Sequence, residues 1–348
     1  MNFIITLIIL IIILGIIVFV HEFGHFLAAK KCGVYVHEFA IGMGPKIFSF
    51  KRKNDETVYS LRLLPLGGFT ALAMAENDFK VSKDKVLDNK KFGQKVMILL
   101  MGIFFNFILT IILLFINGLI YGSPQTGAVV GEIQTDSPAD IAGLETNDEI
   151  IEINNKKITS WDDVILELNY VQNDISEYDF LVLRDGKKIN LTIIPEVSET
   201  NDGVVRSFGF GTSTEKDYGF ISALKYGAIG FKDMFVSLFK ILGNLFTGKI
   251  GVDNLSGPVG VFGVVDQIKQ SGLESIIYLT AYLSINVGII NLIPIPVFDG
   301  GRVVLSIAEK IKGGKLNPNI EVILNNIGLI LLIILFVYVT LNDIIKIF

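Results

Sequence analysis

The stretch VFVHEFGHFLAAKKCG at residues 18–33 places two histidines and a glutamate at the end of a long apolar run. The run from Phe3 to Val20, with the residues after it, is long enough to cross a bilayer as a retained helix. No positively charged segment precedes it and no small-residue cleavage site follows it, so we expect no cleavable signal peptide. Ionisable side chains are costly in hydrocarbon, and their presence here indicates a functional site.

His21, Glu22 and His25 match the pattern H-E-x-x-H. Residues four apart on a helix share a face, so both imidazoles can bind one zinc ion. Glu22 is adjacent, where it can take a proton from a metal-bound water. The chain has three histidines, and the third, His37, lies in a basic loop and is not expected to be a ligand.

A catalytic zinc ion usually has three protein ligands and a water molecule. We expect Asp299, within NLIPIPVFDGG at residues 291–301, to be the third ligand. The two prolines interrupt a helix, and such breaks at membrane depth are tolerated where they line protein or a cavity. The alternative is a helix end with a solvated aspartate. The predicted topology favours the ligand, because both motifs fall on the same side of the bilayer.

The composition is that of an integral membrane protein, with 51% hydrophobic residues and a mean hydropathy of +0.57. Four segments reach spanning length, at about residues 3–28, 96–120, 275–296 and 322–341. The third contains Ser284, Asn286 and Asn291, which should face other helices or a cavity. Nothing in the net charge of −5 suggests nucleic-acid binding, and the single Cys32 excludes an intrachain disulfide.

The distribution of basic residues predicts the orientation. They concentrate after the first span and again after the third, at Lys30, Lys31, Lys46, Lys51, Arg52, Lys53, Arg62, Lys80, Lys83, Lys85, Lys90, Lys91, Lys95, Arg302, Lys310, Lys312 and Lys315. By the positive-inside rule both loops are cytoplasmic. Both termini and the long acidic region between the second and third spans are then expected outside.

The chain is expected to divide into four parts. A first membrane half (1–121) is followed by a compact outer domain at 122–196, where strand, turn and capped-helix signals alternate. An outer linker at 197–274 includes an apolar pattern of helical period at 220–248, which predicts a helix at the membrane surface. The second membrane half (275–348) carries the aspartate motif. Within the first half, residues 56–74 alternate as a strand, turn at PLGG and alternate again, which predicts a hairpin.

Several motifs together resemble the site-2 protease family of intramembrane zinc metalloproteases, specifically the bacterial regulator-of-sigma-E protease group. They cover essentially the whole chain: VHEFGH, AIGMGPKIF (40–48), LRLLPLGGFTAL (61–72), Asn106, LSGPVGV (255–261), SINVGIINLIPIPVFDGG (284–301) and LNDI (341–344). The chain departs from the family pattern at GIFFN (102–106), where no proline precedes the asparagine. It also has room for one PDZ domain, whereas many relatives of this group carry two.

The resemblance implies a polytopic α-helical membrane protein with an inserted extracytoplasmic PDZ-like α+β domain at 122–196 and a cytoplasmic, re-entrant β-hairpin. It implies one zinc ion per chain held by His21, His25 and Asp299, with Glu22 as general base. It also implies a transmembrane protein or peptide substrate, which the open edge of the hairpin could hold as an added strand. Substrate-binding residues are then expected at Asn106, Asn291, Gly67 and Gly68.

The family resemblance further places the chain in the inner (cytoplasmic) membrane, with its active site near the cytoplasmic side. A peptide or a C-terminus is the expected ligand of the PDZ-like domain, and the plain alternative is a spacer domain. Asn106 and Asn291 could instead stabilise the oxyanion of the reaction or the packing of the helices. Two rival functions are an inactive PDZ-bearing membrane scaffold and a transporter. The intact H-E-x-x-H and aspartate motifs argue against the first, and the lack of an inverted repeat argues against the second.

Overall fold

The computed structural model describes residues 2–74, 81–168, 176–200 and 203–347. Within these residues, four helices are long and apolar enough to cross a membrane, in agreement with the four expected spans. They are α1 (Asn2–Lys31), α2 (Phe92–Tyr121), α7 (Leu273–Leu292) and α9 (Pro318–Ile347). The chain forms two compact units, of which the first comprises residues 1–113 and 255–348 and the second residues 114–254.

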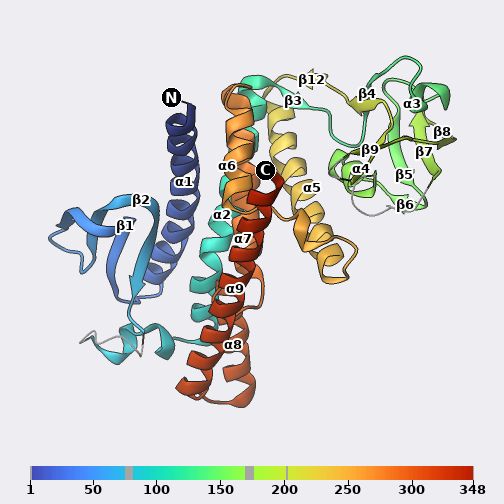
Figure 1. Cartoon of the computed structure of the whole chain (residues 1–348). Coiled ribbons are helices and arrows are strands. Elements are labelled where there is room, and N and C mark those ends of the chain that lie inside the picture. The colour runs from blue at the N-terminus through green and yellow to red at the C-terminus, as the bar shows by residue number, and fades with distance from the viewer. Residues whose placement is uncertain (1, 75–80, 169–175, 201–202, 348) are drawn as a thin grey trace. The chain divides into compact units, whose positions relative to one another are not determined.

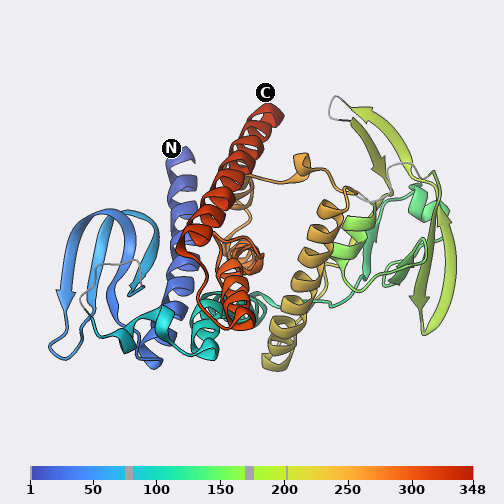
Figure 2. The ribbon, with the colours of Figure 1, turned by 90° about the horizontal axis from the view of Figure 1, so that it is seen from below.

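The first unit also contains a β-sheet beside the first helix (Figure 1). Strand β1 (Val36–Lys51) pairs with β2 (Val58–Leu72), and two 3-10 turns, η1 (Lys83–Lys85) and η2 (Leu87–Asn89), lead into α2. Residues 38–41 of β1 pair with 58–61 and also with 68–71 of β2, so this part of β1 lies between two arms of its partner. Figure 2 shows the same sheet and helix from below.

This pairing corrects the hairpin expected within 56–74. The two arms of that segment do not pair with each other, because β1, which we had not assigned as a strand, lies between them. The left-handed conformation of Gly67 (φ 78°) allows the bend between the arms. The hairpin of this unit is therefore formed by β1 and β2, with its turn at residues 52–57.

A buried ion cluster lies on this sheet. The Glu38 carboxylate is 4% exposed and accepts hydrogen bonds from Ser60 Oγ and from Arg62 Nη2, the latter at 2.8 Å. Lys46 Nζ lies 2.9 Å from its other oxygen. Burial alone would raise the pKa of Glu38, but the hydrogen bonds from Ser60, Lys46 and Arg62 outweigh burial and lower it.

Two shorter helices complete the first unit. They are α6 (Pro258–Ile268) and α8 (Asp299–Lys312). Asp343 of α9 accepts hydrogen bonds from the backbone N–H groups of Gly257 (2.9 Å) and Gly260 (2.7 Å), and so caps the start of α6. At the other end of α6, Asp266 accepts a hydrogen bond from Thr6 Oγ1 of α1 at 2.6 Å. The hydrogen bonds of Asp343 to Gly257 and Gly260 bring the motifs LSGPVGV (255–261) and LNDI (341–344) together in the fold.

The second unit is a small α+β domain followed by a long helix. A four-stranded sheet has the order β6-β5-β7-β8, and its members are β5 (Glu149–Ile153), β6 (Lys156–Lys157), β7 (Tyr178–Arg184) and β8 (Lys187–Ile193). The other elements are β3 (Ser123–Pro124), β4 (Val130–Ile133), α3 (Pro138–Ile141), α4 (Trp161–Leu166), β9 (Glu196–Thr200), β10 (Gly203–Ser207), β11 (Phe210–Thr212), β12 (Lys216–Asp217), α5 (Phe220–Phe246) and η4 (Val252–Asn254).

The domain continues past residue 196, where we expected it to end. Strand β11 pairs with β4, and the Phe208 side chain packs in the same core as Tyr178 and Phe180. The polar composition of 197–206 suggested a linker, because local hydrophobicity does not reveal pairing with a distant segment. Helix α5 begins at Phe220, as its periodicity predicts, and Lys240 Nζ donates to Asp163 of the domain at 2.7 Å.

Candidate metal centre

The two histidines of the H-E-x-x-H pattern lie near the end of α1, which continues without interruption to Lys31. Their four-residue spacing places both rings on one face of the helix. His21 is 7% exposed and His25 is 8% exposed, so both rings are removed from solvent. Their Nε2 atoms lie 3.2 Å apart, and the two ligand atoms therefore converge on one point.

Asp299 reaches the histidines because α7 ends before it. The last helical residue of α7 is Leu292, and α8 begins at Asp299 itself. The chain turns tightly between the two helices, with Phe298 N donating to Ile295 O at 2.9 Å. A Cβ atom on Gly300 would lie 2.2 Å from Leu292 O, so only glycine fits behind the aspartate. The two prolines and the glycine together explain how the motif directs Asp299 inward.

The three side chains form one cluster of ligand atoms. Asp299 Oδ2 lies 3.1 Å from Nε2 of His21 and 3.1 Å from Nε2 of His25. Tetrahedral zinc ligands at about 2.0–2.1 Å from the metal are roughly 3.3 Å from each other, so the observed spacing suits a zinc ion. Among the described residues, His21, His25 and Asp299 form the one set of potential ligands that lie close enough together to hold a metal ion. Two imidazoles and one carboxylate are a donor set typical of catalytic zinc.

Helix α2 covers this cluster at very short range. A Cβ atom on Gly24 would lie 2.4 Å from Met101 O, so the backbones of α1 and α2 meet here. The ring of His25 donates from Nδ1 to the carbonyl oxygen of Ile98 at 2.8 Å. On the same helix, the Asn106 amide lies 3.3 Å from Nδ1 of His21. Each histidine therefore contacts α2 through the ring nitrogen that does not face Asp299.

Glu22 lies next to the cluster on α1 and is partly exposed, unlike its two histidine neighbours. Among the described residues its carboxylate makes no hydrogen bond, whereas its backbone oxygen accepts one from Thr70 Oγ1 of β2 at 3.0 Å. The carboxylate is therefore available to a water molecule or a substrate, and the sheet is attached to α1 at this residue.

Known proteins resemble this chain over almost its whole length. The model of peptidase family M50 matches residues 9–335. This chain belongs to peptidase family M50. It is 33% identical to the regulator of sigma-W protease RasP of Bacillus subtilis, covering 99% of this chain and 100% of that protein. It is 36% identical to the putative zinc metalloprotease FN1322 of Fusobacterium nucleatum and 30% identical to the zinc metalloprotease RasP of Bacillus licheniformis, with 99% of each chain covered.

Membership of family M50 confirms the resemblance to site-2 proteases that the motifs indicated. The chain is accordingly an integral membrane zinc metalloprotease. The H-E-x-x-H and aspartate motifs both lie inside the matched region.

The other residues predicted to contribute to the site occupy different surroundings. Asn106 is fully buried beside His21. Asn291 donates to Val287 O of its own helix at 2.9 Å, and among the described residues no hydrogen bond joins its amide to the ligand cluster. Gly67 and Gly68 lie in β2, and a Cβ atom on Gly67 would lie 3.2 Å from Val18 of α1. His37 is not part of the cluster.

Sequence reasoning did not predict the roles of Gly24, Ile98 and Thr70. The role of Gly24 could have been found from the sequence, because a glycine inside the H-E-x-x-H pattern indicates a close approach. In the structure, α2 crosses α1 at this glycine. The role of the Ile98 carbonyl oxygen could not be found from the sequence, because any residue supplies the same backbone group.

Proposed function

We propose that this chain is an intramembrane endopeptidase that hydrolyses a peptide bond within or near the transmembrane segment of a membrane-protein substrate. The observation that supports it best is the convergence of His21, His25 and Asp299 at spacings of 3.1–3.2 Å beside a spanning helix. In this proposal these three side chains hold the zinc ion, one per chain, and Glu22 is the general base. Zinc, when bound, polarises the scissile carbonyl and lowers the pKa of a coordinated water molecule.

The residues of the chain carry the proton transfers. Glu22 takes the proton of the attacking water and afterwards delivers it to the nitrogen of the leaving strand. Its partly exposed carboxylate, which has no hydrogen-bond partner among the described residues, supports this role. The buried histidines and Asp299 remain as fixed ligands.

The substrate must present an unwound peptide bond, because a helix hides its carbonyl groups in its own hydrogen bonds. We propose that it adds as a strand to residues 68–72 of β2. This arm pairs with β1 on one side and has no strand partner on the other side among the described residues. It contacts α1, and Thr70 attaches it to the backbone of Glu22. Gly67, Gly68, Asn106 and Asn291 are the proposed substrate-binding residues around this path.

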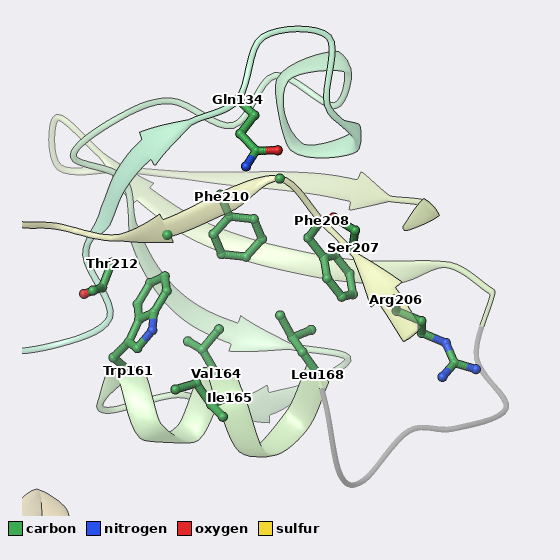
Figure 3. A pocket seen from close by; sticks show the side chains of 12 residues that line it. Gln134, Trp161, Val164, Ile165, Leu168, Arg206, Ser207, Phe208, Phe210 and Thr212 are labelled. Carbon is green, nitrogen blue, oxygen red and sulfur yellow. The ribbon is translucent and has the colours of Figure 1, made fainter. Parts of the chain in front are cut away.

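The domain in the second unit is proposed to be PDZ-like and to bind a peptide or a C-terminus. Its groove, with a volume of about 360 Å³, lies between α4 and the segment 206–212 (Figure 3). Its lining combines the apolar side chains of Trp161, Ile165 and Phe210 with polar ones such as Gln134, and Arg206 lies at one end. A groove between a helix and a strand is where PDZ domains accept an extended peptide.

The proposed orientation follows from the basic residues at the ends of the spans. Helix α1 ends with Lys30 and Lys31, and α8 ends with Lys310 and Lys312 in its last turn. We propose a cytoplasmic-membrane location, with the zinc site near the cytoplasmic side and the PDZ-like domain and both termini outside. The regulator of sigma-W protease among the relatives suggests an anti-sigma factor as one type of substrate; a signal-peptide remnant is another.

The deciding experiment compares the wild type with Glu22→Gln in detergent, measuring bound zinc and the cleavage of a model transmembrane peptide. We expect both proteins to bind about one zinc ion and the variant to lose about 100-fold or more of its activity. Glu56→Gln, at an exposed glutamate of the same unit, should cleave like the wild type. If neither protein binds zinc, the proposed centre is wrong. If all bind zinc and none cleaves any transmembrane peptide tested, the inactive scaffold becomes the better explanation.

A further inference from the structure

Each histidine of the metal centre has a second ring nitrogen, and its partner there decides which nitrogen carries the proton. Nδ1 of His25 lies 2.8 Å from Ile98 O. A carbonyl oxygen can only accept, so the proton of His25 is on Nδ1 and Nε2 is free to bind a metal. Nε2 is also the atom that faces Asp299, and the two observations agree.

His21 needs an equivalent acceptor. Its Nε2 faces both Asp299 and His25, so a neutral His21 that binds zinc must carry its proton on Nδ1. The group opposite Nδ1 is the side-chain amide of Asn106, with Nδ2 at 3.3 Å. The Asn106 side chain is fully buried, and its Oδ1 has no hydrogen-bond partner among the described residues.

Two N–H donors that face each other make no hydrogen bond. A half-turn of the Asn106 amide exchanges Nδ2 and Oδ1, and it places an acceptor opposite the His21 proton. We propose that Asn106 is a positioning residue whose side-chain oxygen accepts the Nδ1 proton of His21 and so fixes the tautomer and ring orientation that bind zinc. This inference rests on the proposed zinc site.

The surroundings of Asn106 hold its backbone in place for this role. Its backbone oxygen accepts from Thr110 Oγ1 at 3.0 Å and from Ser284 Oγ of α7 at 2.9 Å. Both hydroxyl groups belong to fully buried residues, so α2 and α7 are joined at this turn. After the half-turn, the NH₂ group takes the buried position of Oδ1 and points away from His21.

The test measures the zinc affinity of the full-length protein in detergent, after removal of metal, by competition with a chromophoric chelator. Asn106→Leu removes the acceptor, and we expect its zinc affinity to fall about 10–100-fold. Asn106→Asp supplies an acceptor that cannot donate, so its affinity should equal or exceed that of the wild type. Asn117→Leu removes another buried amide of α2 and should bind zinc like the wild type.

Rescue by the aspartate separates positioning from a general packing defect. Wild-type affinity in Asn106→Leu would overturn the inference, as would an aspartate variant that binds as weakly as the leucine variant. If the leucine variant does not fold, the aspartate variant decides alone, because a loss of about tenfold or more there also overturns it. A wild type that binds no zinc would instead reject the proposed centre, and this inference with it.

Discussion

A Cβ atom added to Gly102 would lie 2.4 Å from Nε2 of His25. It would also lie 2.9 Å from Cε1 of His21, so α2 presents a bare backbone to both rings. Contacts this short cannot persist between real atoms, and the rings or the helix would have to move. The proposed zinc site is therefore shaped by Gly102, which has no side chain to bind the metal.

We predict that Gly102→Ala abolishes or strongly weakens zinc binding, by at least about tenfold, because the methyl group displaces the ligand nitrogens. Gly93→Ala is the matched control on the same helix, since a Cβ atom there meets nothing within 4 Å. Zinc content after dialysis and cleavage of a model transmembrane peptide check both variants. Wild-type zinc content in Gly102→Ala would show that the rings are free to move aside.

Asp343→Asn should destabilise the start of α6. A charged acceptor at a helix N-terminus contributes about 1–2 kcal/mol, and both backbone donors lose it here. Faster amide hydrogen exchange at residues 257–262 and a lower melting temperature in detergent are the expected results. Thr340→Val removes a hydroxyl that donates to Phe336 O of its own helix, and it should leave both unchanged. Unaltered exchange in Asp343→Asn would mean that other contacts hold α6.

The peptide binding proposed for the groove of the second unit can be followed by fluorescence, because Trp161 is the single tryptophan of the chain and lines the groove. An apolar peptide with a free C-terminus should shift its emission. Ile165→Glu should weaken binding about tenfold or more, since it places a charge among apolar side chains. Ile141→Glu, at a residue 80% exposed and outside the groove, is the control. Equal affinities in the two variants would locate the peptide elsewhere.

The ion cluster at Glu38 predicts an acid-sensitive contribution to stability. Its folded pKa lies below the ordinary value of 4.5, so the unfolded chain binds the proton more tightly. The stabilisation is thus present above about pH 4.5 and is lost as the pH falls through the folded pKa. Glu38→Gln should lower the free energy of unfolding at pH 7 by about 2–3 kcal/mol. In this variant the free energy of unfolding should also decrease less than in the wild type as the pH falls.

Glu56→Gln is the control for that series, because the pair of Glu56 with Lys85 is exposed and contributes little. Denaturant unfolding in detergent between pH 7 and pH 3 makes the comparison. If the Glu38 and Glu56 variants lose stability in parallel with the wild type as the pH falls, the cluster is not its source.

Several features of this protein follow from local sequence alone. The four-residue spacing of His21 and His25 needs only a helix to bring the rings together, and the apolar run ensures one. The break before Asp299 follows from its two prolines. The four expected spans follow from length and apolarity, and the described residues include four helices of that length and apolarity. Each of these depends on neighbours a few residues apart, which is why composition and periodicity suffice.

Tertiary structure decided the rest, because it depends on groups far apart in the chain. Asp299 is separated from His21 by 278 residues, and only the packing of α1, α7 and α8 brings them within 3.1 Å. Strand β1 separates the two arms of β2, and β11 extends the domain of the second unit, through pairings that no local pattern reveals. The contact of Asn106 with His21 likewise requires α2 to cross α1 at Gly24 and Gly102. The sequence by itself determined the chemistry of the ligands, whereas helix packing determined how they are oriented.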